Sequence, residues 1–267
     1  MHIFGYRIDR SVASERVALG PLDAPVLHRG EKNVGCIVLH GVSGTPANMR
    51  AVSDELIARG YSVDAPMLAG HGETVEKLSR TTAEDFVDTA LAAYERLRGA
   101  GCEKIICIGL SLGGLITGVL AEEKPLAGTV LICPPVVMQP FLRVSAYLSL
   151  LFPFVRYEKN RKTPPDAYHN GFDGMATRKL NDIKRLSRRF LKNADRIRCP
   201  LLTVAAGRDD KVDEKSYPLI KEYAVNAPQQ HIDYPNSKHG CTYGAERDKV
   251  AKAVADFVDQ IAGAEQE

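Results

Sequence analysis

The chain has 267 residues, of which 45% are apolar and 25% charged, and its 35 Lys and Arg nearly balance its 33 Asp and Glu. This composition is typical of a globular protein with a sizeable core, and a net charge of +2 argues against nucleic acid as a partner. No segment approaches the ~20 apolar residues of a membrane-spanning helix, and the first residues are too short an apolar run for a secretory signal. We therefore expect a cytoplasmic protein with one large domain, or one domain carrying an insertion.

The six cysteines show no spacing typical of a metal site or of a redox pair. None lies in a C-x-x-C pair, and no Cys/His cluster has zinc spacing. Cys36, Cys107 and Cys133 fall in predicted buried strands, where a free thiol packs like a small apolar side chain. We expect neither a metal nor an organic cofactor, and the sequence leaves disulfides open.

In chain order, the first 33 residues contain two short runs, 16–19 and 25–28, that are candidates for an antiparallel pair. From about residue 34 onward, short apolar runs alternate with helical patterns. Strands separated by helices predict a mostly parallel sheet with helices on both faces, an α/β fold. The predicted strands are residues 36–39, 61–65, 104–108, 129–133, 201–205 and 229–234, and the predicted helices are residues 47–59, 82–97, 112–121 and 245–261.

One long segment interrupts this alternation. More than sixty residues without a strand pattern separate the strands at 129–133 and 201–205, too many for a simple connection. We expect a helical cap, or lid, at 135–198, inserted into a core of residues 1–134 and 199–267. Its first part is apolar and suits packing on the core, an acyl pocket or contact with a lipid surface. Residues 155–198 carry thirteen Lys or Arg and five Asp or Glu, which suits a solvated helical face or attraction of anionic substrates or membranes.

The strongest local pattern is Gly-Leu-Ser-Leu-Gly at residues 109–113, between a predicted strand and a predicted helix. In this context the G-x-S-x-G pattern is typical of a sharp turn that exposes a nucleophilic serine above the sheet. We therefore expect Ser111 to be a nucleophile, the alternative being an ordinary glycine-rich turn.

A serine hydroxyl needs a base to accept its proton and an acid to orient that base. Both are expected on loops at the carboxyl ends of later strands, in the chain order serine, acid, histidine. Of the seven histidines, His239 fits this position, because it follows the strand at 229–234. Asp209 and Asp210 both follow the strand at 201–205, and their chemistry alone does not choose between them.

The serine mechanism also needs two donors for the oxyanion of the transition state. One is expected to be the backbone N–H of Leu112, directly after the nucleophile, at the start of its helix. The other is expected from the loop after the first parallel strand, His-Gly-Val-Ser-Gly at residues 40–44, where Gly41 lets the chain bend and Val42 offers its N–H.

Together these segments resemble the α/β-hydrolase superfamily, and more narrowly its group of small bacterial carboxylesterases and monoacylglycerol lipases. The resemblance covers about residues 34–262 and is weakest across 135–198. It rests on residues 39–44, 70–72 and 109–114, on Gly207 with the aspartate three residues later, and on 237–239.

The resemblance implies a role for each site residue. The family's acid lies three residues beyond the loop glycine, which implies Asp210 rather than Asp209. The family's oxyanion donors correspond to the amides of Val42 and Leu112, and its helical cap corresponds to the insertion. The chain departs from the pattern in its extra N-terminal residues and its basic insertion, which bear on the substrate rather than on the chemistry.

The function expected from this reasoning is hydrolysis of carboxylic esters through an acyl-serine intermediate, with Ser111 as nucleophile, His239 as base and Asp210 as acid. The expected partner is a small-molecule ester with an apolar acyl chain, within lipid metabolism, and transient contact of the cap with a lipid surface is compatible with it. A feruloyl esterase, a thioesterase or a C–C hydrolase on the same scaffold is the alternative, and a hydrolase-like binding protein without turnover is a remote one. The sequence leaves the acyl length, the alcohol group and the oligomeric state open.

Overall fold

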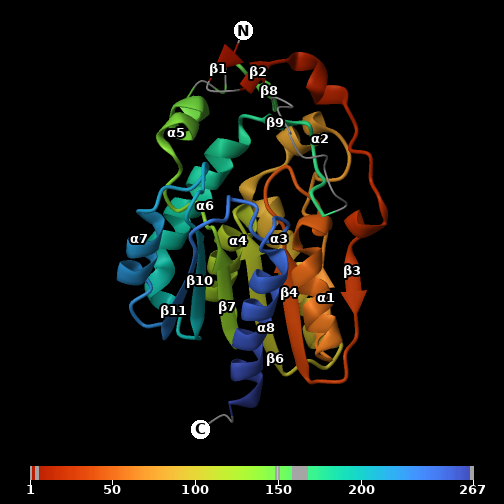
Figure 1. The fold of residues 1–267 in the computed structure, drawn as a ribbon, viewed down its shortest axis with the longest axis vertical. Helices are drawn as coiled ribbons and strands as arrows, with labels where there is room; N and C mark the ends of the chain where they lie inside the picture. Colours follow the sequence, from red (N-terminus) through yellow and green to blue (C-terminus); the bar gives the residue numbers. More distant parts are fainter. Residues whose placement is uncertain (1, 4–5, 148, 150, 158–167, 265–267) are drawn as a thin grey trace.

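The computed structural model describes residues 2–3, 6–147, 149, 151–157 and 168–264, and a seven-stranded sheet forms its centre (Figure 1). The strand order is β11-β10-β7-β6-β4-β5-β3, and all neighbours are parallel except β3, which runs antiparallel to β5. The strands are β3 (Val26–His28), β4 (Val34–Leu39), β5 (Ser62–Ala65), β6 (Lys104–Leu110), β7 (Gly128–Ile132), β10 (Leu201–Ala206) and β11 (Gln229–Tyr234).

Both faces of this sheet are buried, which explains why its strands are continuous apolar runs rather than alternating ones. In β6, Ile105 and Cys107 belong to one core cluster, whereas Ile106 and Ile108 belong to the other. Helices α1 (Arg50–Ala58) and α8 (Arg247–Gly263) cover one face, and α3 (Ala83–Gly99) and α4 (Leu112–Glu123) cover the opposite face. The predicted α/β architecture, with a mostly parallel sheet and helices on both faces, is confirmed.

The strands and helices of this core lie within a few residues of their predicted limits. Helix α3 begins after Thr82, whose side chain accepts from the Asp85 amide while the Asp85 carboxylate accepts from the Thr82 amide, so the predicted start is confirmed. Two core helices were not predicted, α2 (Val75–Arg80) and α7 (Ser216–Tyr223). Among the described residues, no helix is both long and apolar enough to cross a bilayer.

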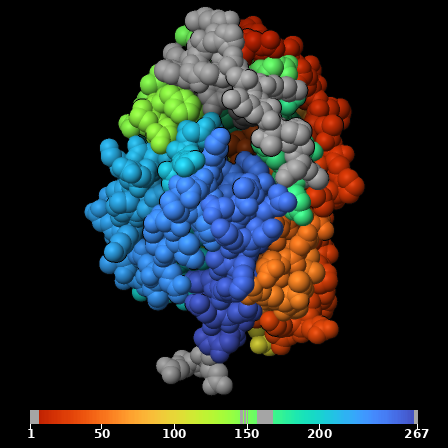
Figure 2. Space-filling model, viewed as in Figure 1, coloured from red at the N-terminus to blue at the C-terminus, as the bar shows by residue number. Residues whose placement is uncertain are grey.

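The N-terminal prediction is wrong in its pairing. Strand β3 pairs with β5 rather than with residues 16–19, and Arg16 instead forms an isolated bridge with Thr74. In the space-filling view the N-terminal segment, in red, runs along one edge of the molecule beside α1, in orange (Figure 2). A partner far along the chain leaves no local pattern for sequence reasoning to detect.

The insertion is only partly helical, which corrects the expectation of a strand-free segment. It contains α5 (Pro140–Tyr147) and α6 (Lys179–Asn193), but also β8 (Phe154–Tyr157) and β9 (Gly174–Ala176). With β1 (His2–Ile3) and β2 (Tyr6–Ile8) these strands form a second, antiparallel sheet of order β1-β2-β8-β9 (Figure 1). Residues 148, 150 and 158–167 of the predicted cap lie outside the described residues.

Candidate active site

Ser111 occupies a sharp turn between β6 and α4. Its backbone has φ 56° and ψ −116°, in the left-handed half of conformational space that side chains rarely adopt. Two glycines permit this turn, because a Cβ at Gly109 would lie 2.1 Å from the Gly113 carbonyl oxygen and one at Gly113 would lie 2.4 Å from that of Leu39. The G-x-S-x-G spacing is therefore a steric requirement of this strand–turn–helix crossing.

Backbone strain in the described residues gathers around this turn. The non-glycine residues with positive φ are Ser43, Ser111 and Cys133, at the ends of the loops and strands that surround the site. Such strain persists only where the surrounding structure holds the backbone in place. Here the Ser111 amide donates a hydrogen bond to the Ile132 carbonyl at 2.8 Å, which holds the turn. The geometry indicates a functional turn.

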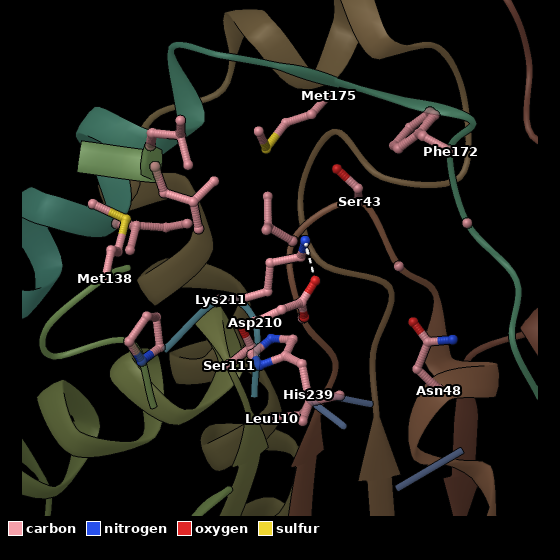
Figure 3. Close-up of a pocket in the computed structure, with 18 of the residues that line it drawn as sticks. Ser43, Asn48, Leu110, Ser111, Met138, Phe172, Met175, Asp210, Lys211 and His239 are labelled. Carbon is pink, nitrogen blue, oxygen red and sulfur yellow. Dashed lines mark hydrogen bonds and ion pairs between the residues drawn. The ribbon is translucent and has the colours of Figure 1, made fainter. Parts of the chain in front are cut away.

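His239 follows β11 and lines the same cavity as Ser111 (Figure 3). Its Nδ1 lies 2.8 Å from Oδ2 of Asp209, which follows β10. Strands β10 and β11 are parallel neighbours with Ala206 opposite Tyr234, so the loops after them leave the sheet at the same edge. The sheet thus brings together side chains from three loops, as the chain order of serine, acid and histidine predicts.

The prediction that Asp210 orients His239 is wrong, because the structure gives that contact to Asp209. The Asp210 side chain is 66% exposed and pairs with the Lys211 ammonium at 2.9 Å, whereas the Asp209 side chain is 5% exposed. Both Asp210 and Lys211 lie at the cavity, where Figure 3 shows their contact.

The reason is the shape of the turn after β10. This strand continues to Ala206, and the Asp209 amide then donates to the Ala206 carbonyl at 3.1 Å. The amides of Lys211 and Val212 donate to the second oxygen of Asp209 at 2.8 and 2.9 Å. Both carboxylate oxygens of Asp209 therefore have hydrogen-bond partners within the protein. The spacing of the acid from the loop glycine, on which the prediction of Asp210 rested, carries no information about these partners.

The electrostatics of Asp209 suit an ionised orienting acid. Burial by itself would raise the pKa of its carboxyl group, but the hydrogen bond and charge of His239 and the two loop amides outweigh burial and hold the pKa below its usual range. Asp209 is then the acceptor, so the proton of the shared hydrogen bond resides on Nδ1 of His239. This leaves Nε2 as the basic nitrogen.

The loop after β4 passes directly beside Ser111. A Cβ at Gly41 would lie 3.3 Å from the Ser111 Cβ, and Gly41, Val42 and Ser43 all line the cavity. Leu112 is the first residue of α4, so its N–H has no partner within the helix. The amides of Val42 and Leu112 thus remain the proposed oxyanion donors.

Two buried histidines hold this loop in shape. The His40 ring bonds to the Gly41 carbonyl at 2.8 Å and accepts from the Leu68 amide at 3.0 Å, and His71 accepts from the Ser43 amide at 3.2 Å. Burial lowers the pKa of His40 to about 4 and places that of His71 well below its ordinary value, so both rings are neutral at pH 7. Both rings therefore organise the loop rather than transfer protons.

A cavity of about 510 Å³ opens above these residues, and the insertion supplies much of its wall (Figure 3). Its lining is mixed. The apolar side chains include Met138, Phe141, Leu142, Phe172, Met175, Leu180 and Ile183, and the polar ones include Asn48, His169, Asn170 and Tyr243.

Contacts that sequence reasoning missed join the insertion to the oxyanion loop. The Phe172 amide donates to the Ser43 carbonyl at 2.8 Å, and the Asn48 side chain donates to the carbonyls of Tyr168 and Asn170 at 2.8 and 3.1 Å. The Ser43 hydroxyl is buried without a partner among the described residues. No local sequence pattern predicts the contacts of Phe172 and Asn48. Only the polar Ser-Gly pair at 43–44 indicates a loop.

Among the described residues, one group of three side chains has the donors and spacing to hold a metal ion, Cys133, Asp209 and His239. Its members include the base and the acid of the serine site. As an arrangement for chemistry, the site offers a nucleophile on a strained turn, a partly buried acid–base pair and a mostly apolar cavity.

Comparison with known proteins agrees with this geometry. The profile described as "Alpha/beta hydrolase family" matches residues 36–253. The chain is 29% identical to a carboxylesterase of Bacillus subtilis (strain 168), over 87% of this chain and 94% of that protein. It is 28% identical to a thermostable monoacylglycerol lipase of Bacillus sp. (strain H-257), over 86% and 92%. A solved structure from a study of the metagenome-derived lipolytic enzymes LipS and LipT superposes with a TM-score of 0.77 at 22% identity, covering 90% of this chain and 98% of that one, and so shares the fold.

Proposed function

This chain belongs to the alpha/beta hydrolase family, and we propose that it is a serine hydrolase that cleaves carboxylic esters through an acyl-serine intermediate. The observation that carries the proposal is the partly buried Asp209–His239 hydrogen bond, at the same cavity as a serine on a strained turn. The similarity to a carboxylesterase and to a monoacylglycerol lipase supports the choice of esters.

In the proposed first step, His239 accepts the Ser111 proton at Nε2 while the serine oxygen attacks the ester carbonyl. The ionised Asp209 accepts a hydrogen bond from the Nδ1–H group throughout and stabilises the imidazolium that forms. The alcohol leaves with the proton from Nε2. Water then attacks the acyl carbonyl while giving a proton to the same nitrogen, and the carboxylic acid leaves as that nitrogen returns the proton to the Ser111 oxygen.

The amides of Val42 and Leu112 are proposed to bind the oxyanion of both tetrahedral intermediates. Their elements are held by backbone contacts, and preorganised donors of this kind each contribute about 10²–10³ in rate. The neutral rings of His40 and His71 hold the loop that carries Val42, which keeps its donor in place without adding a positive charge.

The mixed lining of the cavity, with many apolar side chains and several polar ones, supports an ester with an apolar acyl chain and a polar alcohol group. We propose that residues 135–198 act as a cap whose apolar side chains receive the acyl chain, while Asn48 and Tyr243 face the alcohol. The exposed apolar side chains of Val144, Tyr147 and Leu151 on the outer surface of this cap are compatible with transient contact with a lipid surface.

The test is a panel of nitrophenyl esters of increasing acyl length, run on the wild type and on Ser111→Ala. We expect wild-type turnover that the substitution lowers by at least about 10⁴-fold, together with covalent labelling of Ser111 by an alkyl phosphonate. Equal, slow hydrolysis by both proteins contradicts the serine mechanism. Activity on monoacylglycerols but not on triacylglycerols selects the lipase, and a preference for aryl-acrylic esters selects a feruloyl esterase.

A further inference from the structure

Two thiols lie close to the Asp209–His239 pair. Cys133 follows β7 in a left-handed conformation, and Cys241 comes two residues after His239. Both side chains are almost fully buried, and their sulfur atoms are 3.9 Å apart. The proposed serine mechanism uses neither of them.

The thiols extend the acid–base pair into a set of metal-type donors. The Cys133 sulfur, an Asp209 carboxylate oxygen and a His239 ring nitrogen all lie within 4.8 Å of one another. The cluster offers one sulfur, one nitrogen and one oxygen, and the Cys241 sulfur lies next to it, 3.9 Å from that of Cys133. This is the donor chemistry of tetrahedral zinc sites.

The spacing is close to what such an ion requires. Bond lengths of about 2.3 Å to sulfur and about 2.0–2.1 Å to nitrogen or oxygen place neighbouring donors of a tetrahedron about 3.3–3.8 Å apart. The Asp209–His239 contact of 2.8 Å needs to widen by about 0.5 Å to reach this range. His239 lines the cavity with 17% of its side chain exposed, which gives an ion a route from solvent.

We propose that Cys133, Asp209 and His239 form an inhibitory site for a thiophilic divalent cation, Zn²⁺ or Cd²⁺. Binding of the ion follows from these donors alone, whereas inhibition rests on the proposed serine mechanism. Hard cations such as Mg²⁺ and Ca²⁺ are excluded by the same donors, because they take sets of oxygen ligands.

Inhibition follows from the position of one proton. In the metal-free site the His239 proton resides on Nδ1 and Nε2 is free to accept the Ser111 proton. An ion at Nδ1 needs the lone pair of that nitrogen, so the ring proton moves to Nε2 and the base is lost. The thiol proton of Cys133 passes to solvent, and the ion occupies the place of the hydrogen bond between His239 and Asp209.

The experiment uses the full chain, reduced and freed of metal, and titrates it with Zn²⁺, Cd²⁺, Mg²⁺ and Ca²⁺. We expect saturable loss of nitrophenyl-ester turnover with Zn²⁺ and Cd²⁺ at one ion per chain, recovery with EDTA, and no loss with Mg²⁺ or Ca²⁺. Cd²⁺ is also expected to produce an ultraviolet cadmium–thiolate band of the same stoichiometry.

Variants locate the site, each compared with its own metal-free rate. Cys133→Ala is expected to raise the half-inhibitory concentration at least tenfold and to remove most of the cadmium band, with Cys133→Ser as the substitute if the alanine variant does not fold. Cys199→Ala is the matched control, because this half-buried thiol contacts Thr129 at another strand end and is expected to behave as the wild type.

Several outcomes overturn the proposal. These are wild-type metal sensitivity in Cys133→Ala, loss of sensitivity in Cys199→Ala, and inhibition that a thiol reductant reverses but EDTA does not. The cadmium band is also measured in Ser111→Ala, so that a protein without esterase activity still reports on the ion site. Failure of the serine mechanism and failure of the metal site are thereby distinguished.

Discussion

The turn at Ser111 and the insertion that covers it meet at one cavity but are specified in different ways. The turn is marked by two glycines, each two residues from Ser111, which admit the backbone of Gly113 and of Leu39. The insertion is fixed by partners more than a hundred residues away, as in the contacts of Arg156 on β8 with Asp9 and Glu15. In this protein the turn that carries the nucleophile is therefore marked by a short sequence pattern, whereas the insertion that lines the cavity depends on long-range packing.

The largest expected effect separates the two adjacent aspartates at the sheet edge. We expect Asp209→Asn to lower kcat by about 10³–10⁴-fold, because the neutral side chain no longer accepts from Nδ1 and no longer stabilises the imidazolium. Asp210→Asn is the matched control and is expected to change kcat less than threefold, since its carboxylate is mostly exposed. Steady-state kinetics on one short ester measure both, and equal losses in the two variants would contradict the assignment.

An intermediate effect concerns the stability of the loop that carries Val42. The pKa of His40 is about 4 in the folded protein and about 6.5 when unfolded, so only the unfolded chain takes up this proton between those values. The contribution of His40 to the free energy of unfolding is therefore at its maximum above about pH 6.5. It declines as the pH falls towards 4, by at most about 3 kcal/mol.

Urea unfolding at pH 7 and pH 5 measures this contribution. His40→Gln keeps a donor and an acceptor in the loop but removes the titrating ring, so we expect it to lose less stability on acidification than the wild type. His28→Gln, on β3 away from the loop, serves as the control. The interpretation of His40 is wrong if the two variants show the same pH dependence.

The smallest effect tests the insertion. Met175 on β9 is buried and lines the cavity, so Met175→Ala removes one wall contact from a long acyl chain. We expect kcat/KM to fall about tenfold on long-chain esters, in keeping with the loss of about 1.5 kcal/mol of apolar contact, and to stay within threefold on acetate esters. Thermal unfolding of the variant checks that the fold is retained, and an equal fall on both ester classes would separate Met175 from acyl recognition.

Much of the core was predictable because its signals are local. A buried parallel strand such as β6 is a continuous apolar run, a helix start such as Thr82 carries its capping partner three residues later, and the turn at Ser111 shows its glycines. The strands β8 and β9 were not predictable, since they have three or four residues and the sheet that they form depends on β2, near the N-terminus, which pairs with β8. A short strand is defined by its neighbour, and a neighbour of that kind leaves no periodicity in the sequence.

The candidate site divides along the same line. The sequence by itself determined Ser111 and His239, because steric demands of the turn and the order of parallel strands restrict where such residues stand. Only the tertiary structure decided between Asp209 and Asp210, because that choice depends on where β10 ends and on which carboxylate the loop amides and His239 surround. It also decided that two thiols 108 residues apart meet close to the Asp209–His239 pair, since packing across the sheet, rather than spacing along the chain, sets which side chains touch.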